Sequence, residues 1–243
     1  MYRKRRGCLG RIRRFVFKTV FYLFIASILA VAAGKFLPVY YTPLMFIRAA
    51  EAVKAGEKPK LQRQWTPIDK ISPNMVQAVV ASEDNLFMQH NGFSIDDIKK
   101  ARAENKSGKR FRGGSTISQQ TAKNVFLWPK RSWIRKGFEA YFTVLIELIW
   151  GKERIMEVYL NVIETGSGIY GAPAAAKHYF NTTPDKLSRH QAAAIAVCLP
   201  NPRRFNPAQP SSYIQRRTRH INNLMGKIGK VDLQSKPKKK DKK

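Results

Sequence analysis

The sequence predicts a mostly α-helical domain that follows one N-terminal transmembrane helix. A long apolar run lies behind a basic N-terminus, over residues 15–37. From about residue 62 onward, apolar residues recur at helical spacing, and Ser, Pro and Gly stand where helices begin and end. No sustained alternation of apolar and polar residues of strand type accompanies them. The chain of 243 residues is long enough for one medium-sized domain with extensions.

The apolar run predicts an uncleaved membrane anchor. It reaches the length of a bilayer if Lys18 and Lys35 extend their ammonium groups to the membrane surfaces. The arginines and lysines that precede it place the N-terminus in the cytoplasm. The alternative is a signal peptide cleaved near Ala30–Ala32, but the run is long for such a peptide, and Tyr40 and Tyr41 lie where an interfacial belt is expected. Both interpretations place the folded domain outside the cytoplasm.

The net charge of +29, from 45 Lys and Arg against 16 Asp and Glu, points to anionic partners. Residues 1–50 contain no acid and residues 230–243 are rich in Lys, yet the middle of the chain is also basic. A folded surface must therefore share the charge. Anionic lipid, phosphate-bearing ligands and nucleic acid are the candidates. The transmembrane segment and the lack of interleaved base-stacking aromatic residues argue against nucleic acid.

The two cysteines are not expected to form a disulfide. Cys8 precedes the apolar run and Cys198 lies in an apolar helix, so a membrane would separate them. No Cys/His spacing of a metal site is present, and the four histidines are scattered.

The predicted organisation has five parts, with the Lys-rich tail expected to be disordered. They are a basic cytoplasmic segment 1–14, the anchor 15–37, a juxtamembrane linker 38–61, the domain 62–228 and the tail 229–243. In the linker, apolar residues such as Leu44 and Phe46 fit either the membrane interface or core packing.

Capping signals predict where the helices of the domain begin. Ser72 followed by Pro73 marks one start, and Ser188 with Gln191 makes a capping box at another. Ser115 is expected to cap a helix that runs to about Asn124. The remaining expectations are a mobile loop over 105–112, helices over 152–161, 172–180 and about 211–228, and a long helix 132–150 with Phe138, Phe142, Leu145 and Ile149 on one side.

Glu83 is the first candidate for chemistry. It follows Val79 and Val80 by four and three residues, so it projects from the apolar face near a helix C-terminus. Burial and the negative end of the helix dipole both disfavour its charged form, and a raised pKa suits general acid/base catalysis. The alternative is a helix-end acid paired with a nearby Arg or with His90.

Two further stretches gather polar and basic groups. Gly113–Asn124 opens a helix with a glycine pair, which exposes backbone N–H groups to an anion, although the pattern also fits an ordinary capped surface helix. Arg135 and Glu139 are spaced to pair along a helix, and Lys130, Arg131 and Lys136 add cations. A diphosphate leaving group needs such cations to stabilise its developing charge.

Together these stretches resemble the family-51 glycosyltransferases, which polymerise peptidoglycan. The E-D-x-x-F-x-x-H-x-G motif is matched by Glu83–Gly92, and G-G-S-T-I-[ST]-Q-Q by Gly113–Gln120. Arg135–Glu139 matches R-K-x-x-E, and Tyr159–Asn161 and Gly168–Gly171 match two further elements. The resemblance covers roughly residues 62–225. With no transpeptidase domain following, the chain looks like the monofunctional biosynthetic peptidoglycan transglycosylases of that family.

The resemblance implies a lysozyme-like helical fold and an enzyme that joins lipid-linked disaccharide-peptide (lipid II) into β-1,4 glycan strands with inversion. Glu83 matches the general base and Glu139 the second essential carboxylate. The positions implied to bind substrate are Asp84, Ser115, Gln119, Lys123, Asn124, Arg131, Arg135 and Lys136. A divalent cation such as Mg²⁺ assists some such reactions, but no ligand set is legible, and no organic cofactor is expected.

The implied location is the bacterial inner membrane, with the catalytic domain on its outer side. The implied partners are lipid II, the growing lipid-linked strand, the membrane, and other cell-wall synthesis or division proteins. A glycan-cleaving enzyme of the same fold is the enzymatic rival, but cleavage gives no reason to surround the sugar site with cations. A non-catalytic membrane-anchored assembly factor is the rival of another class.

Overall fold

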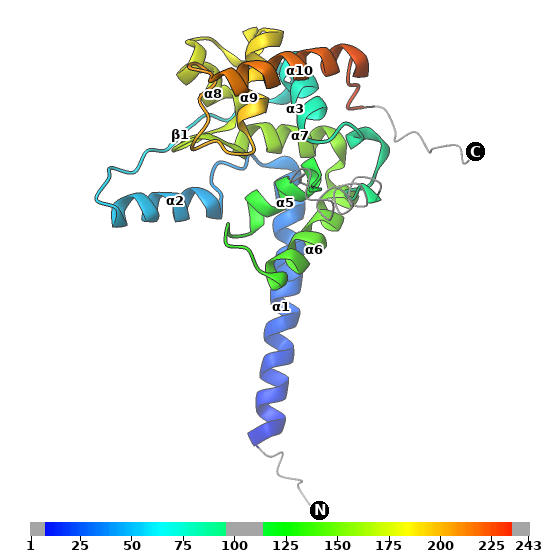
Figure 1. Cartoon of the computed structure of the whole chain (residues 1–243). Helices are drawn as coiled ribbons and strands as arrows, with labels where there is room; N and C mark the ends of the chain where they lie inside the picture. Colours follow the sequence, from blue (N-terminus) through cyan, green and yellow to red (C-terminus); the bar gives the residue numbers. More distant parts are fainter. Residues whose placement is uncertain (1–7, 96–113, 235–243) are drawn as a thin grey trace, which may run out of the picture. The chain divides into compact units, whose positions relative to one another are not determined.

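The computed structural model describes residues 8–95 and 114–234 (Figure 1). The predicted mobile loop 105–112 and the last residues of the Lys-rich tail lie outside these ranges. The chain divides into two compact units, residues 1–37 and 38–243. The first contains α1 (Cys8–Phe36), whose part from Gly10 to Phe36 is long and apolar enough to cross a membrane. Its helix therefore begins within the segment predicted to be cytoplasmic.

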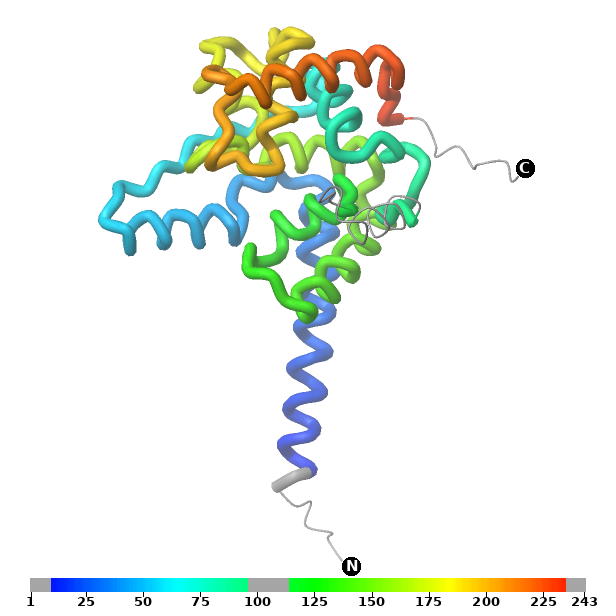
Figure 2. The backbone as a smooth tube through the Cα atoms, viewed as in Figure 1, coloured from blue at the N-terminus to red at the C-terminus, as the bar shows by residue number. Residues whose placement is uncertain are grey.

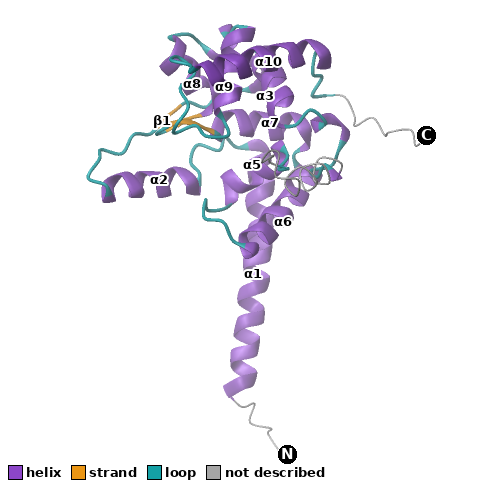
Figure 3. Cartoon of the chain, viewed as in Figure 1, coloured by secondary structure: helices purple, strands orange, loops and turns teal. Residues whose placement is uncertain are grey.

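The second unit is mostly helical, as predicted, with one small sheet (Figure 3). Its elements in chain order are α2 (Pro43–Lys54), β1 (Gln62–Arg63), η1 (Ile68–Lys70), α3 (Pro73–Glu83), η2 (Phe87–Gln89), α5 (Ile117–Phe126), α6 (Trp133–Ile149), α7 (Gly151–Val162), β2 (Glu164–Gly166), β3 (Ile169–Tyr170), α8 (Gly171–Phe180), η3 (Pro184–Lys186), α9 (Arg189–Cys198) and α10 (Ser212–Ile228).

Two groups of helices build the second unit. In the first, α9 packs against both α3 and α10, and in the second, α5 packs against both α6 and α7 (Figure 2). In α9, all residues from Ala192 to Cys198 are buried, and the small side chains of its alanines allow the neighbouring helices to pack closely. The core between the groups includes large side chains without measurable exposure, among them Met75, Phe87, Ile117, Ile155 and Tyr159. This core fixes the end of α3 against α5.

Most predicted helix starts are confirmed. Ser72, Ser132 and Ser211 each accept a backbone N–H at a helix start, and Ser188 forms the expected capping box with Gln191. The prediction for Ser115 is wrong, because Thr116 caps α5. Only Thr116 stands three residues before Gln119, whose side-chain oxygen accepts the N–H of Thr116 at 3.0 Å.

Three very short strands form a sheet in the order β1-β3-β2, where the sequence predicted no strands. Strands of two or three residues are too short to show an alternating pattern. Gly171, at φ +81°, joins β3 to α8, and a Cβ there would lie 2.6 Å from the carbonyl oxygen of Asn161. The turn therefore requires glycine.

The structure shows which side of α6 is buried, a point that the sequence left open. The apolar residue Phe138 is 47% exposed, while the residues that face the interior are Arg135, Glu139, Thr143 and Ile146. Conversely, Trp133 is 92% exposed and Leu148 is 77% exposed. The helix therefore turns its charged stripe inward and its apolar side outward, which is opposite to the usual pattern of a soluble domain.

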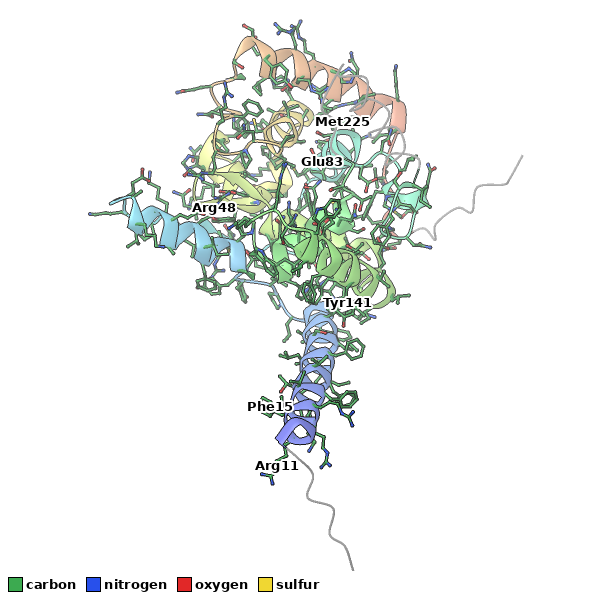
Figure 4. The ribbon with its side chains drawn as sticks, turned by 60° about the horizontal axis from the view of Figure 1, so that its bottom comes forward. Arg11, Phe15, Arg48, Glu83, Tyr141 and Met225 are labelled. Atoms are coloured by element: carbon green, nitrogen blue, oxygen red, sulfur yellow. The ribbon has the colours of Figure 1, made fainter. Side chains whose placement is uncertain are left out.

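Helix α2 occupies part of the segment expected to be a linker. Leu44 and Met45 are buried in a cluster with Tyr170, whereas Phe46 is 60% exposed. Arg48, labelled in Figure 4, lies with its Nε 3.6 Å from Glu164 Oε2 of β2. Both the apolar contact and this ion pair join α2 to the sheet.

Candidate active site

Glu83 is the last residue of α3, and its carboxylate is partly buried against α5 (Figure 4). Gln120 Nε2 donates to Glu83 Oε2 at 2.9 Å, and the Ser82 hydroxyl donates to Oε1 at 3.3 Å. Burial raises the pKa of Glu83, while these hydrogen bonds and the charge of Lys123 oppose the rise. The raised pKa agrees with the expectation from the sequence and suits a group that takes up a proton.

The neighbouring Asp84 is buried and hydrogen-bonded to two groups of the protein. His90 Nε2 lies 3.0 and 3.1 Å from its two oxygens, and the backbone N–H of Ile117 donates to Asp84 Oδ2 at 3.0 Å. Since Ile117 begins α5, the carboxylate ties the end of α3 to the start of α5. A negative group at a helix N-terminus is favourable there. This geometry gives Asp84 a positioning role, and its contact with substrate stays a prediction.

The start of α5 is also hydrogen-bonded to the segment that follows η2. The Thr116 hydroxyl donates to the carbonyl oxygen of Gly92 at 2.6 Å, and the oxygen of the Gln119 side chain completes the capping box. Gln119 is therefore engaged in the cap, and Ser115 is exposed just before it. The cap orients the next turn of α5, which carries Gln120, Lys123 and Asn124.

Lys123 lies in the electrostatic field of the Glu83 and Glu139 carboxylates. Burial lowers its pKa, the charge of Glu139 opposes that effect, and the nearby cations Arg135 and Lys136 add to it. Within residues 8–95 and 114–234, no hydrogen bond or ion pair occupies its ammonium group. Its charge is thus available to an anionic ligand.

Glu139 lies in a different environment from Glu83. It is 3% exposed, accepts a hydrogen bond from Arg135 Nη1 at 2.9 Å, and pairs with the ammonium of Lys136. Charge-assisted hydrogen bonds of this kind are stronger than neutral ones. The carboxylate of Glu139 therefore fixes the positions of the two cations around it.

Two buried donors beside this cluster lack partners in the described part of the chain. They are Asn124 Nδ2 and Arg135 Nε, on residues that are 4% and 8% exposed. A buried donor without an acceptor is costly unless a ligand or water supplies one. Both belong to the predicted substrate-binding set. Arg131, another member, is exposed in the segment before α6, and no described residue pairs with it.

Three groups at the site were not among the site residues predicted from the sequence. Gln120 bridges Glu83 to Tyr159, whose hydroxyl donates to Gln120 Oε1 at 3.4 Å. Burial, with Glu83 and Asp84 nearby, raises the pKa of Tyr159 well above its usual value. Glu147 accepts from Ser118 at 2.5 Å and from Lys152 at 2.7 Å, and so links α5, α6 and α7. The sequence signal for Gln120 was its place beside Gln119 at the end of the Gly113–Gln120 motif.

The described ranges contain no group of three or more His, Cys, Asp or Glu side chains that could hold a metal ion. The acidic groups near Lys123 are already committed, Asp84 to His90 and Glu139 to two cations. These residues do not fit the ligand set that Mg²⁺ prefers, which is several free oxygens.

The chain is similar to known transglycosylases over most of its length. A family model described as Transglycosylase matches residues 50–226. The biosynthetic peptidoglycan transglycosylase of Bacteroides thetaiotaomicron is 56% identical over 222 residues, which cover 91% of this chain and 90% of that protein. Those of Bdellovibrio bacteriovorus and Caulobacter vibrioides are 50% and 48% identical, covering 87% and 92% of this chain and 85% and 95% of those proteins. The chain therefore belongs to the transglycosylase family.

Proposed function

We propose that this chain is a membrane-anchored peptidoglycan transglycosylase. It joins lipid-linked disaccharide-peptide units into β-1,4 glycan strands and releases polyprenyl diphosphate. The observation that carries the proposal is the pairing of two carboxylates in opposite environments around one ammonium group. Glu83 has a raised pKa and no paired cation among the described residues, whereas Glu139 is held by Arg135 and Lys136. Such a contrast separates a proton acceptor from a charge organiser.

Glu83 acts as the general base. Its carboxylate takes the proton from the 4-hydroxyl of the acceptor sugar as that oxygen attacks C1 of the donor sugar. The new bond forms on the face opposite the leaving group, so the configuration at C1 inverts. The bond from C1 to the diphosphate oxygen breaks, and its electron pair stays on the diphosphate. Gln120 and Ser82 hold the carboxylate in place through the transfer.

The cations beside Glu139 receive the leaving diphosphate. Lys123 supplies an ammonium without a partner in the described structure, and Arg135 and Asn124 supply buried donors of the same kind. Lys136 and Arg131 extend the positive surface outward. Donors that are oriented before the reaction stabilise developing negative charge without reorganising. Ser115 and Gln119 shape the approach to this pocket, and Asp84 holds the end of α3 against the start of α5.

The membrane supplies both the anchor and the substrate. Helix α1 is the single-pass anchor, with the N-terminus in the cytoplasm and the catalytic unit outside the inner membrane. On α6, the outward apolar side includes Trp133, Ile134, Phe138, Val144 and Leu148, each at least 45% exposed. An exposed apolar face of this extent fits contact with a bilayer interface. That contact brings Glu139, on the inner side of the same helix, to the depth of the lipid diphosphates.

The proposal is tested by polymerisation of lipid-linked disaccharide-peptide by the purified full chain in detergent. Wild type is compared with Glu83→Gln and with Glu153→Gln, which makes the same change at an exposed residue of α7. We expect long, lysozyme-sensitive glycan from wild type and Glu153→Gln. For Glu83→Gln we expect a rate about 10²- to 10⁴-fold lower.

Each other outcome contradicts one part of the proposal. If no variant makes polymer and soluble fragments are released from cell walls instead, the enzyme cleaves glycan. If Glu83→Gln polymerises as fast as wild type, another group is the base. An assembly factor without catalytic activity would give neither polymer nor fragments.

A further inference from the structure

Helix α10 presents a face of uncompensated positive charge. Its buried stripe consists of Ile214, Thr218, Ile221 and Met225. At 100° per residue, Arg216, Arg219 and Lys227 lie on the opposite side, and all three are exposed. Residues 186–231 contain no Asp or Glu at all. The helix is therefore amphipathic, with cations in place of the mixed charges that usually cover a solvent face.

Several basic side chains elsewhere in the unit are held in ion pairs. Arg48 pairs with Glu51, and Arg154 pairs with Glu157. Among the residues that the structure describes, no ion pair involves the three α10 cations. Unpaired like charges along one helix create a local positive potential that attracts anions. The basic face of α10, Arg216, Arg219 and Lys227, thus has the character of a recognition surface.

A shallow recess of about 550 Å³ adjoins this face, between α9 and α10. Arg189 Nη2, at the start of α9, donates to the carbonyl oxygen of Asn222 at 2.7 Å. A Cβ at Gly226 would lie 3.2 Å from that same nitrogen, so the glycine allows the guanidinium to lie close against α10. His190 and Asn223 complete the lining. Guanidinium and amide donors in one recess suit a carboxylate.

The position of α10 argues against lipid as the partner. Within the second unit, α10 and α6 lie at opposite ends (Figure 1), and they belong to different helix groups. With the apolar outer side of α6 on the bilayer, α10 faces away from it. A partner at α10 must then be an anion that extends from the membrane surface, not a headgroup within it.

We propose that the recess and the basic face of α10 bind the carboxylates of the peptides carried by the glycan strand. This rests on the proposed function, because the strand is its product. A peptide attached through its N-terminus ends in a free carboxylate, so each repeat of the polymer carries negative charge. Helix α10 is about 25 Å long, which allows several carboxylates to be held at once. Weak contacts repeated along a strand add up to firm retention.

The test measures binding of soluble glycan strands to the full chain in detergent micelles. The strands come from purified cell walls, with peptides intact or removed by an amidase, so binding is measured apart from polymerisation. Two variants alter the proposed surface: Asn223→Asp places a carboxylate in the recess with little change in shape, and Arg216→Glu with Arg219→Glu reverses two exposed charges. The matched control reverses two exposed lysines on other helices, Lys54→Glu with Lys177→Glu.

We expect wild type and the control to bind peptide-bearing strands with similar affinity, and each α10 variant to bind about tenfold more weakly. Removing the peptides should weaken wild-type binding to the same extent. The proposal would be overturned if the Lys54→Glu, Lys177→Glu control lost as much strand affinity as the α10 variants. It would also be overturned if wild type bound peptide-free strands as tightly as peptide-bearing ones. The same holds for α10 variants that lose binding to phosphatidylglycerol vesicles but keep it for strands. The polymerisation assay reports separately on the proposed function, because strand binding does not require Glu83.

Discussion

Breaking the buried Arg135–Glu139 ion pair should destabilise the fold more than breaking the exposed Lys136–Glu139 pair. The side chains of Glu139 and Arg135 are 4% and 10% exposed, and the hydrogen bond between them is 2.9 Å long. Removing one member of a buried ion pair costs about 3–5 kcal/mol, because the other charge is left without compensation. In Glu139→Gln the amide oxygen still accepts one hydrogen bond, which favours the lower value of about 3 kcal/mol. For a unit of this size that lowers Tm by about 6–12 °C.

Loss of a buried charge partner differs from a simple loss of packing in that a second substitution can restore stability. Adding Arg135→Met to Glu139→Gln removes the orphaned guanidinium, so the double variant should recover about 1–3 kcal/mol relative to Glu139→Gln alone. Thermal unfolding of wild type, both single variants and the double variant supplies the cycle. Lys136→Met is the control, since its side chain is 43% exposed and its loss should cost less than about 1 kcal/mol. Additive destabilisation in the double variant would refute the buried-pair argument.

Three further predictions follow from the same contacts. Because burial raises the folded pKa of Glu83, its contribution to stability declines as pH rises through that pKa. Glu83→Gln should therefore raise Tm at neutral pH, by about 2–4 °C for each kcal/mol gained, while lowering the polymerisation rate about 10²- to 10⁴-fold. The polymerisation rate should fall on the acid side at a pH above 4.5, where Glu83 becomes protonated, and on the basic side at a pH below 10.5, where Lys123 loses its charge. Initial rates measured across pH test this. Lys123→Arg should move only the basic limb of the profile to higher pH. Gly92→Ala should cost about 1–3 kcal/mol in denaturant unfolding, because the residue has φ +85° and a Cβ would lie 2.7 Å from Thr143 Cγ2, whereas Gly56→Ala, at φ +74° with open space around it, should cost only the backbone strain of about 1 kcal/mol.

Local signals were sufficient for most helix boundaries and for the placement of Glu83. Capping is decided by side chains within three residues of the helix start, so Ser72 and Ser188 could be recognised from sequence. Glu83 follows from helical spacing alone, since the apolar residues before it fix the buried side of α3. Ser115 and Thr116 are adjacent hydroxyl residues, and only Thr116 has the three-residue spacing to Gln119 that a capping box needs.

Contacts between helices could not be read in the same way. The bond from Gln120 to Glu83 depends on how α5 meets α3, and the bridge of Glu147 to Ser118 and Lys152 depends on three helices meeting. The sequence outlined an apolar side of α6 but left open which side is buried, although hydrophobicity normally predicts burial. Here the interior is the charged site, and the apolar side faces outward. A sequence pattern gives the two faces of a helix but not which of them meets the protein.

Because α6 turns Glu139 toward the interior, this carboxylate lies near three cations of the site. Lys123, Arg135 and Lys136 would repel one another if no anion lay among them, and Glu139 supplies that anion before any diphosphate arrives. The carboxylate thus keeps the cations oriented in the free enzyme. If so, inorganic pyrophosphate should raise the Tm of Glu139→Gln more than that of wild type, because in the variant the added anion relieves a repulsion that Glu139 otherwise relieves. An equal rise in both proteins would mean that Glu139 does not organise the cations, and that its effect on activity must come from contact with the sugar.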